Sequence, residues 1–102
     1  MWRHHFRAMY RFSFLFLLCG CSAGELTEAG QHVTYTDTEL DVSGCDAVGE
    51  VHSDGISPHD AHSRTTAMHE LRNAAASKGG THVFVDSEKN PDLTRGTAYK
   101  CP

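Results

Sequence analysis

A short apolar run from Phe12 to Leu18 divides the chain into a basic leader and an acidic remainder. Arg3, Arg7 and Arg11 precede this run. The run is far shorter than the roughly 20 residues that a membrane-spanning helix needs, and a basic stretch followed by a short apolar stretch is typical of a signal peptide. We therefore expect residues 1–20 to be a cleaved leader and not a transmembrane anchor.

The residues that close the apolar run, Leu18-Cys19-Gly20-Cys21, resemble the lipobox of bacterial lipoproteins. In a lipobox, the thiol of the last cysteine takes up a diacylglyceryl group, and the small residue before it lets the signal peptidase reach the bond. The resemblance implies that Cys21 is the lipid-attachment residue and anchors the mature chain to a membrane through its acyl chains. Ser22 replaces the Asp that retains such proteins at the inner membrane, which implies an outer-membrane anchor with the domain facing the periplasm. The alternative is an ordinary secretory leader cut near Ser22 to Gly24.

Loss of the leader would leave a small and strongly acidic chain. All 13 Asp and Glu but only 6 of the 9 Lys and Arg follow residue 20, so the net charge becomes −7. Such a charge disfavours nucleic acid and anionic lipid headgroups as partners. Residues 21–31 are small and polar and predict a lipidated, flexible tether. Residues 32–102 are enough for a single small domain.

Two of the four cysteines, Cys45 and Cys101, remain once Cys19 is discarded and Cys21 is acylated. In an oxidising compartment we expect them to form a disulfide. The ring would span about 56 residues, and closing it should contribute roughly 4 kcal/mol by restricting the unfolded chain. Free thiols and half of a metal site are the alternatives, and the lack of a C-x-x-C motif argues against a redox-active pair.

Alternating or continuous apolar residues predict four short strands. The strands are expected at residues 32–36, 47–52, 81–86 and 97–100. Val33 and Tyr35 should share one face of the first strand, and the apolar centre of the third predicts an interior position in the sheet. With one helix between the second and third strands, the expected fold is α+β: a small sheet of about four strands covered by one helix, in the order β-β-α-β-β.

The helix has clear start and stop signals. Ser57 with Pro58 and Asp60 makes a start that resembles a capping box, and Ser63 is an alternative first residue. Gly79-Gly80 predicts a left-handed stop. Helical spacing places one apolar stripe on Ala61, Arg64, Met68, Leu71 and Ala75.

The predicted helix also contains three histidines: His59, His62 and His69. His59 and His62 are close enough along a helix to share a metal ion, whereas His69 is about 10 Å further along the axis. A metal site would therefore need another ligand, such as His52, Asp54 or Asp60. Solvated histidines on a polar helix face are the preferred interpretation, and a pH-responsive role is a further alternative. We assign no metal and no cofactor.

No motif predicts an enzyme. The sequence His69-Glu70-Leu71-Arg72-Asn73 approaches the zincin motif but lacks its second histidine. No nucleophile elbow, phosphate-binding loop or dinucleotide-binding turn is found. Asp37, Glu39 and Asp41 alternate as in a calcium loop, but Leu40 and Val42 break the oxygen-rich pattern. A solvated acidic loop is expected there.

Four stretches together resemble an uncharacterised family of small proteobacterial envelope lipoproteins. They are Gly44-Cys45-x-x-Val48-Gly49-Glu50-Val51, Glu70-Leu71-Arg72-Asn73-x-Ala75, Gly79-Gly80-Thr81-His82-Val83-x-Val85-Asp86-Ser87, and the ending Gly96-Thr97-Ala98-Tyr99-Lys100-Cys101-Pro102. More distantly, the layout is similar to the outer-membrane lipoprotein sensor of the Rcs stress phosphorelay, which has two disulfides where this chain can form one. The resemblance implies an envelope lipoprotein with a structural, interaction or stress-sensing role. The alternative is a periplasmic metal-binding lipoprotein that uses the helix histidines.

Overall fold

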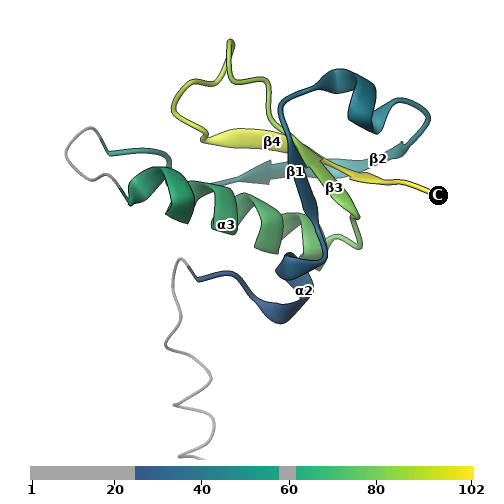
Figure 1. Cartoon of the computed structure of the whole chain (residues 1–102), viewed down its shortest axis with the longest axis horizontal. Coiled ribbons are helices and arrows are strands. Elements are labelled where there is room, and N and C mark those ends of the chain that lie inside the picture. The colour runs from purple at the N-terminus through teal and green to yellow at the C-terminus, as the bar shows by residue number, and fades with distance from the viewer. Residues whose placement is uncertain (1–24, 58–61) are drawn as a thin grey trace, which may run out of the picture.

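The computed structural model describes residues 25–57 and 62–102, which form a four-stranded sheet and a long helix (Figure 1). The elements are the helices α2 (Glu28–Gln31) and α3 (Ser63–Ser77), the 3₁₀ helix η1 (Glu39–Val42), and the strands β1 (Thr34–Thr36), β2 (Asp46–His52), β3 (His82–Phe84) and β4 (Arg95–Lys100). The predicted α+β class and the order of strands and main helix are confirmed. Within the described ranges, no helix has the length and apolar character needed to cross a membrane.

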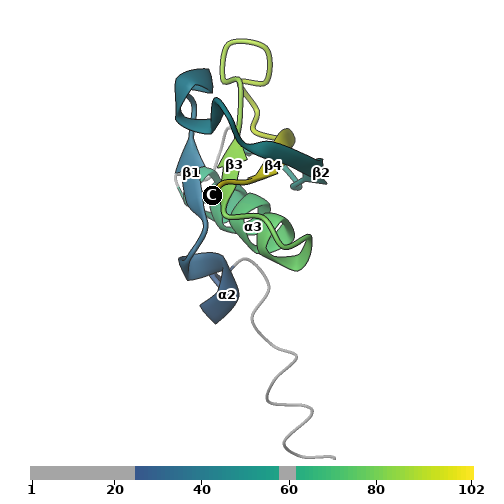
Figure 2. The same ribbon diagram turned by 90° about the vertical axis from the view of Figure 1, so that its right-hand side faces the viewer.

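The sheet is mixed, and its strand order is β1-β3-β4-β2. Strand β1 runs parallel to β3, whereas β4 runs antiparallel to both of its neighbours, β3 and β2. The predicted interior position of the third strand is therefore confirmed. Helix α3 lies across one face of the sheet, and α2 lies at one end of α3 (Figure 2).

The core lies between α3 and the inner face of the sheet. Successive strand residues point to opposite faces, so paired residues alternate between inward and outward pairs. Val83 and Ala98 form an inward pair, and both are fully buried. From the helix, the core receives Ala67, Leu71 and Ala75, all 0% exposed.

The buried stripe of α3 differs in part from the predicted one. Leu71 and Ala75 are buried as expected, and Met68 is partly buried against the core. Arg64 was expected along the stripe but is exposed, and Ala67 takes the buried position one turn before Leu71. A small Ala at this position lets the helix approach the sheet closely, which the long Arg64 side chain would prevent. Ala61 lies outside the described residues.

Helix α3 begins at the alternative start, Ser63, and ends where predicted. The Ser63 hydroxyl accepts a hydrogen bond from the Ser57 amide (2.9 Å) and donates one to the Ser57 carbonyl (3.1 Å). Pro58 and Asp60 of the expected capping box lie outside the described residues. At the C-terminus, Gly79 adopts φ +78°, and the amides of Gly79 and Gly80 bond back to carbonyls of the last turn at 3.0 and 2.8 Å. This is a Schellman motif, which satisfies carbonyls that the helix leaves without partners.

The expected tether at residues 21–31 is in part a folded element. Thr27 caps α2 by accepting a hydrogen bond from the Gly30 amide at 2.9 Å. The Asn73 side chain on α3 accepts bonds from the Thr27 amide (2.9 Å) and hydroxyl (3.0 Å) and donates one to the Glu25 carbonyl (2.7 Å). The folded domain therefore begins by residue 25 and not at His32. Residues 21–24 lie outside the described ranges.

Candidate functional site

Some of the predicted site residues cannot be placed. Cys21, the expected lipid-attachment residue, lies outside the described residues, as do His59 and Asp60. The lipid-anchor prediction and any role of His59 therefore stay predictions.

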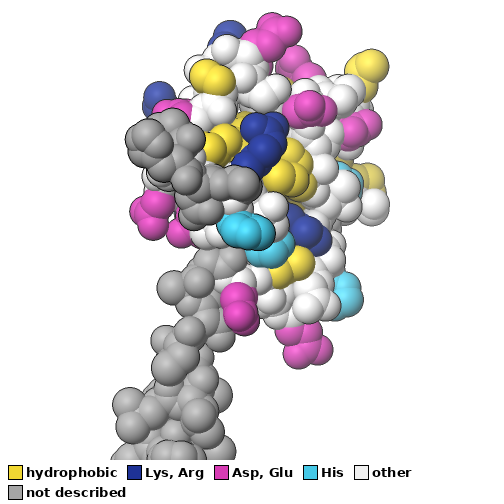
Figure 3. Space-filling model, turned by 60° about the vertical axis from the view of Figure 1, so that its left-hand side comes forward, with side chains coloured by type: hydrophobic (Ala, Val, Ile, Leu, Met, Phe, Trp, Pro, Cys, Tyr) yellow, Lys and Arg dark blue, Asp and Glu magenta, His cyan; other side chains and the backbone are white. Residues whose placement is uncertain are grey.

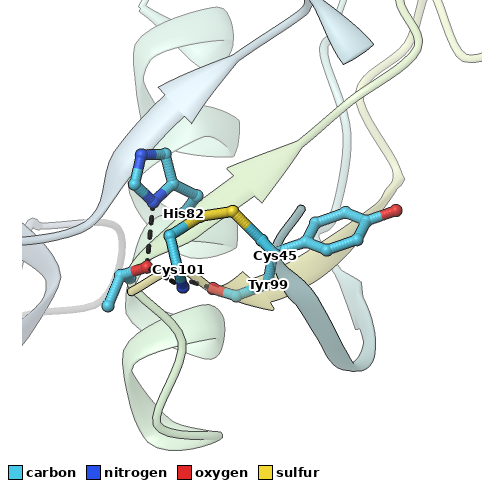
Figure 4. The surroundings of a disulfide bond; sticks show 5 residues. Cys45, His82, Tyr99 and Cys101 are labelled. Atoms are coloured by element: carbon cyan, nitrogen blue, oxygen red, sulfur yellow. Dashed lines mark hydrogen bonds between the residues drawn. A yellow bond between two sulfur atoms is a disulfide. The ribbon is translucent and has the colours of Figure 1, made fainter. Parts of the chain in front are cut away.

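The predicted disulfide is present and joins Cys45, just before β2, to Cys101, just after β4 (Figure 4). The two Cα atoms are 4.4 Å apart, and the cysteines are separated by 56 residues in the sequence. A hydrogen bond from the Cys101 amide to the Thr81 hydroxyl (2.8 Å) fixes one side of the bridge. The same hydroxyl is 2.9 Å from Nδ1 of His82. These contacts hold the chain terminus against the start of β3.

The histidines of α3 lie on the helix side of the molecule. His62 and His69 line one surface pocket of about 380 Å³ together with Glu25, Leu26, Thr65 and Thr66. Figure 3 shows histidine side chains on this side, close to Lys or Arg side chains that lie over hydrophobic ones. His62 and His69 are two turns apart, or about 10 Å along the axis. Among the described residues, no group of three or more His, Cys, Asp or Glu is arranged to hold a metal ion. The metal-binding alternative stays a prediction.

Of the other metal-ligand candidates, His52 is on β2, where its Nε2 lies 3.1 Å from Oε1 of Glu50. Both side chains are more than half exposed, at 62% and 58%. A contact so exposed contributes little to stability. The backbone amide of Asp54 lies 3.2 Å from Oε1 of Glu70 and donates a hydrogen bond to it.

The outer face of the sheet, opposite α3, carries two of the three aromatic rings that follow the leader. Because Val83 and Ala98 point toward the helix, their strand neighbours Phe84 and Tyr99 point away from it. Both rings are half-buried and are not part of the core. Tyr35 does pack against the core, and burial raises the pKa of its hydroxyl above 10.0.

Two hollows flank these outward rings. One, of about 310 Å³, lies beside Phe84 and is lined by both acidic and basic side chains: Glu50, Asp86, Lys89 and Arg95. The other, of about 320 Å³, lies between Tyr99 and η1, and Glu39 is the only charged residue in its lining. The two hollows therefore differ in charge, one being mixed and the other acidic.

The hollow beside Tyr99 has an apolar wall that the sequence did not lead us to expect. Leu40 lines it and is 81% exposed, the largest exposure of any large hydrophobic residue described, while Val42 beneath it is 4% exposed. Both residues belong to the segment that we predicted as a solvated acidic loop. These two apolar residues interrupt the alternation of acidic residues, and this interruption indicates that the segment is a 3₁₀ turn that packs against the sheet.

A polar contact holds η1 against the sheet. The hydroxyl of Thr36, the last residue of β1, donates a hydrogen bond to Oδ2 of Asp41 at 2.5 Å and accepts one from the Thr38 amide at 3.1 Å. Thr36 is 6% exposed whereas Asp41 is exposed, so this contact is partly buried. The position of Leu40 is thus set by its neighbours, because Thr38 and Asp41 bond to Thr36 and Val42 is buried.

Comparison of the chain with models of protein families, with curated proteins and with solved structures gave no match. The resemblance to envelope lipoproteins consequently stays a prediction.

Proposed function

We propose that this protein is a lipid-anchored lipoprotein of the outer envelope whose domain acts by binding other envelope components, in a structural or stress-sensing role. The observation that carries the proposal is the Cys45–Cys101 disulfide. These are the two cysteines that remain once the chain is cut and acylated at Cys21. Disulfides persist in oxidising compartments outside the cytoplasm, where a lipobox would deliver the domain.

The short distance in sequence between the proposed anchor and the fold gives the domain an orientation. Glu25 follows Cys21 by four residues, and four residues reach about 14 Å at most. The end of the domain that carries α2 would therefore stay close to the bilayer. In Figures 1 and 2, η1 and the connection between β3 and β4 lie at the end of the domain away from α2. The proposal thus presents η1 and this connection to the periplasm.

Intact-mass analysis of protein from a native host tests the anchor. We expect a mature chain that begins at Cys21 and carries the mass of two or three acyl chains. Cys21→Ser should abolish both cleavage and acylation. Cys19→Ser is the matched control, because it changes a thiol two residues away and should leave processing intact. A mature chain that starts elsewhere, or that has no acyl mass, would overturn the proposal.

The orientation has a separate test. A fluorescent amino acid placed at Glu28, on α2, should be quenched by a quencher carried on lipid headgroups. The same label at Glu88, in the connection between β3 and β4, should be quenched much less. Both positions are exposed, so the labels should not disturb the fold. Equal quenching at the two positions would contradict the proposed orientation.

A further inference from the structure

We infer that the hollow between Tyr99 and η1 is a docking surface for a basic peptide segment of a partner protein, one that carries a single apolar anchor residue. The inference extends the proposed function, because it names the class of partner that the displayed end of the domain would bind. Three features of the hollow support it: an apolar wall, a fixed shape and an acidic charge.

The apolar wall predicts the anchor residue. Leu40 exposes 81% of its surface beside a hollow of about 320 Å³, which is at the lower end of the volumes of ligand pockets. Tyr99 and Val42 complete the apolar lining. An aliphatic or aromatic side chain seated here would remove the Leu40 side chain from water, which is the main source of affinity in such contacts.

The shape of the hollow is fixed before any partner binds. Thr36 holds η1 through Asp41, and Val42 is buried beneath it. On the other side, Tyr99 belongs to β4, an interior strand of the sheet. A partner would therefore lose less affinity to the ordering of η1 than it would to the ordering of a free loop.

The acidic residues in and around η1 favour a basic partner. Asp37, Glu39 and Asp41 lie within five residues of sequence, and the chain has no Lys or Arg between Arg11 and Arg64. Glu39 lines the hollow and makes no ion pair with any described residue. In Figure 3, the upper right of the visible face carries several acidic side chains near a protruding hydrophobic one. Lys or Arg beside the anchor residue would be attracted to this surface.

The same charge disfavours the other occupants of an exposed apolar wall. A second copy of the mature chain would bring a further net charge of −7 to the contact, and an anionic lipid surface would be repelled in the same way. The hollow beside Phe84 has charged residues of both signs in its lining and gives no such preference.

A titration with defined peptides tests the inference. The full protein, purified from its host in detergent, is titrated into a fluorescent peptide of alternating Lys and Ser with one central Leu, and binding is followed by anisotropy. One control peptide replaces the central Leu with Ser, and another replaces every Lys with Glu. We expect the first peptide to bind at least tenfold more tightly than either control, and added salt to weaken its binding.

Two protein variants locate the site. Leu40→Ser should weaken binding about tenfold, because it removes the apolar wall. Val48→Ser is the matched control: Val48 is the other large exposed hydrophobic residue described, at 36%, and it is not in the lining of the hollow. It should leave binding within about twofold. Unchanged melting temperatures would show that both variants fold.

Several results would overturn the inference: equal binding of the basic and acidic peptides, equal binding without the central Leu, or equal losses in the two variants. The titration does not require acyl chains, so a lack of selective peptide binding would not contradict the proposed lipid anchor. Conversely, a protein without acyl mass can still be titrated.

Discussion

Removing the Cys45–Cys101 disulfide should lower the free energy of unfolding by about 4 kcal/mol. The bridge closes a loop of 56 residues. In the chain-entropy treatment, opening such a loop returns about 14 cal/mol/K to the unfolded chain, which is about 4 kcal/mol at 25 °C. Domains of this size are stable by roughly 4 to 12 kcal/mol, at about 0.05 to 0.15 kcal/mol per residue. The variant Cys45→Ser with Cys101→Ser should therefore lose between a third and all of its stability.

Thermal unfolding followed by circular dichroism measures this effect. For a domain of this size, 1 kcal/mol moves the melting temperature by about 4–8 °C, so the double variant should melt roughly 15–30 °C lower. Reductant supplies an internal control, because it should lower the melting temperature of the wild type to that of the variant and leave the variant unchanged. If the non-reduced wild type and the variant melt together, the bridge does not restrict the unfolded chain as argued.

Three further predictions concern the core, the N-terminal segment and one tyrosine. Leu71 is 0% exposed, so Leu71→Ala should cost about 2–5 kcal/mol in denaturant unfolding, whereas Leu40→Ala at an exposed site should change stability by less than about 0.5 kcal/mol. Asn73→Ala removes three hydrogen bonds to residues 25–27. Because each bond contributes about 1 kcal/mol, backbone hydrogen exchange of residues 25–31 should become at least about tenfold faster. Burial raises the pKa of the Tyr35 hydroxyl above 10.0. The tyrosine therefore ionises first in the unfolded chain, and the free energy of unfolding should fall as the pH rises from about 10 through the folded pKa. In a titration followed by phenolate absorbance, Tyr35→Phe should remove the step at highest pH, and a titration in which that step remains would contradict this.

Local signals made the main elements predictable. The glycine pair after α3 predicted its left-handed stop, and Gly79 has the positive φ that the stop requires. The continuous apolar centre of residues 83–85 predicted an interior strand, and β3 is interior. The disulfide followed from counting the thiols that remain after Cys21. In each case, residues close in sequence, or a simple count, contain the information.

Contacts between distant residues were not predictable in the same way. The polar residues around Thr27 are typical of a linker, yet the distant Asn73 ties them to α3 across 46 residues. Leu93 lies in the connection between β3 and β4, outside any predicted strand or helix, yet it is 0% exposed with φ +56°. Phe84 and Tyr99 point away from the core. Their direction depends on strand register, which composition does not determine.

The disulfide and the proposed docking surface are coupled by their positions in the chain. Cys45 follows Val42 by three residues, and Cys101 follows Tyr99 by two, so the bridge ties η1 to the strand that forms the opposite wall of the hollow. Figure 4 shows Tyr99 directly beside the bridge. Without the bridge, the segment between η1 and β2 could move relative to β4, and the hollow would lose its fixed shape. A partner would then lose affinity, because binding would have to order this segment. The double serine variant should therefore bind the basic peptide more weakly even at a temperature where it is still folded, whereas Leu71→Ala, which destabilises the opposite face of the sheet, should not. If the folded disulfide variant and the wild type bind the peptide with equal affinity, the disulfide does not shape the docking surface and only stabilises the fold.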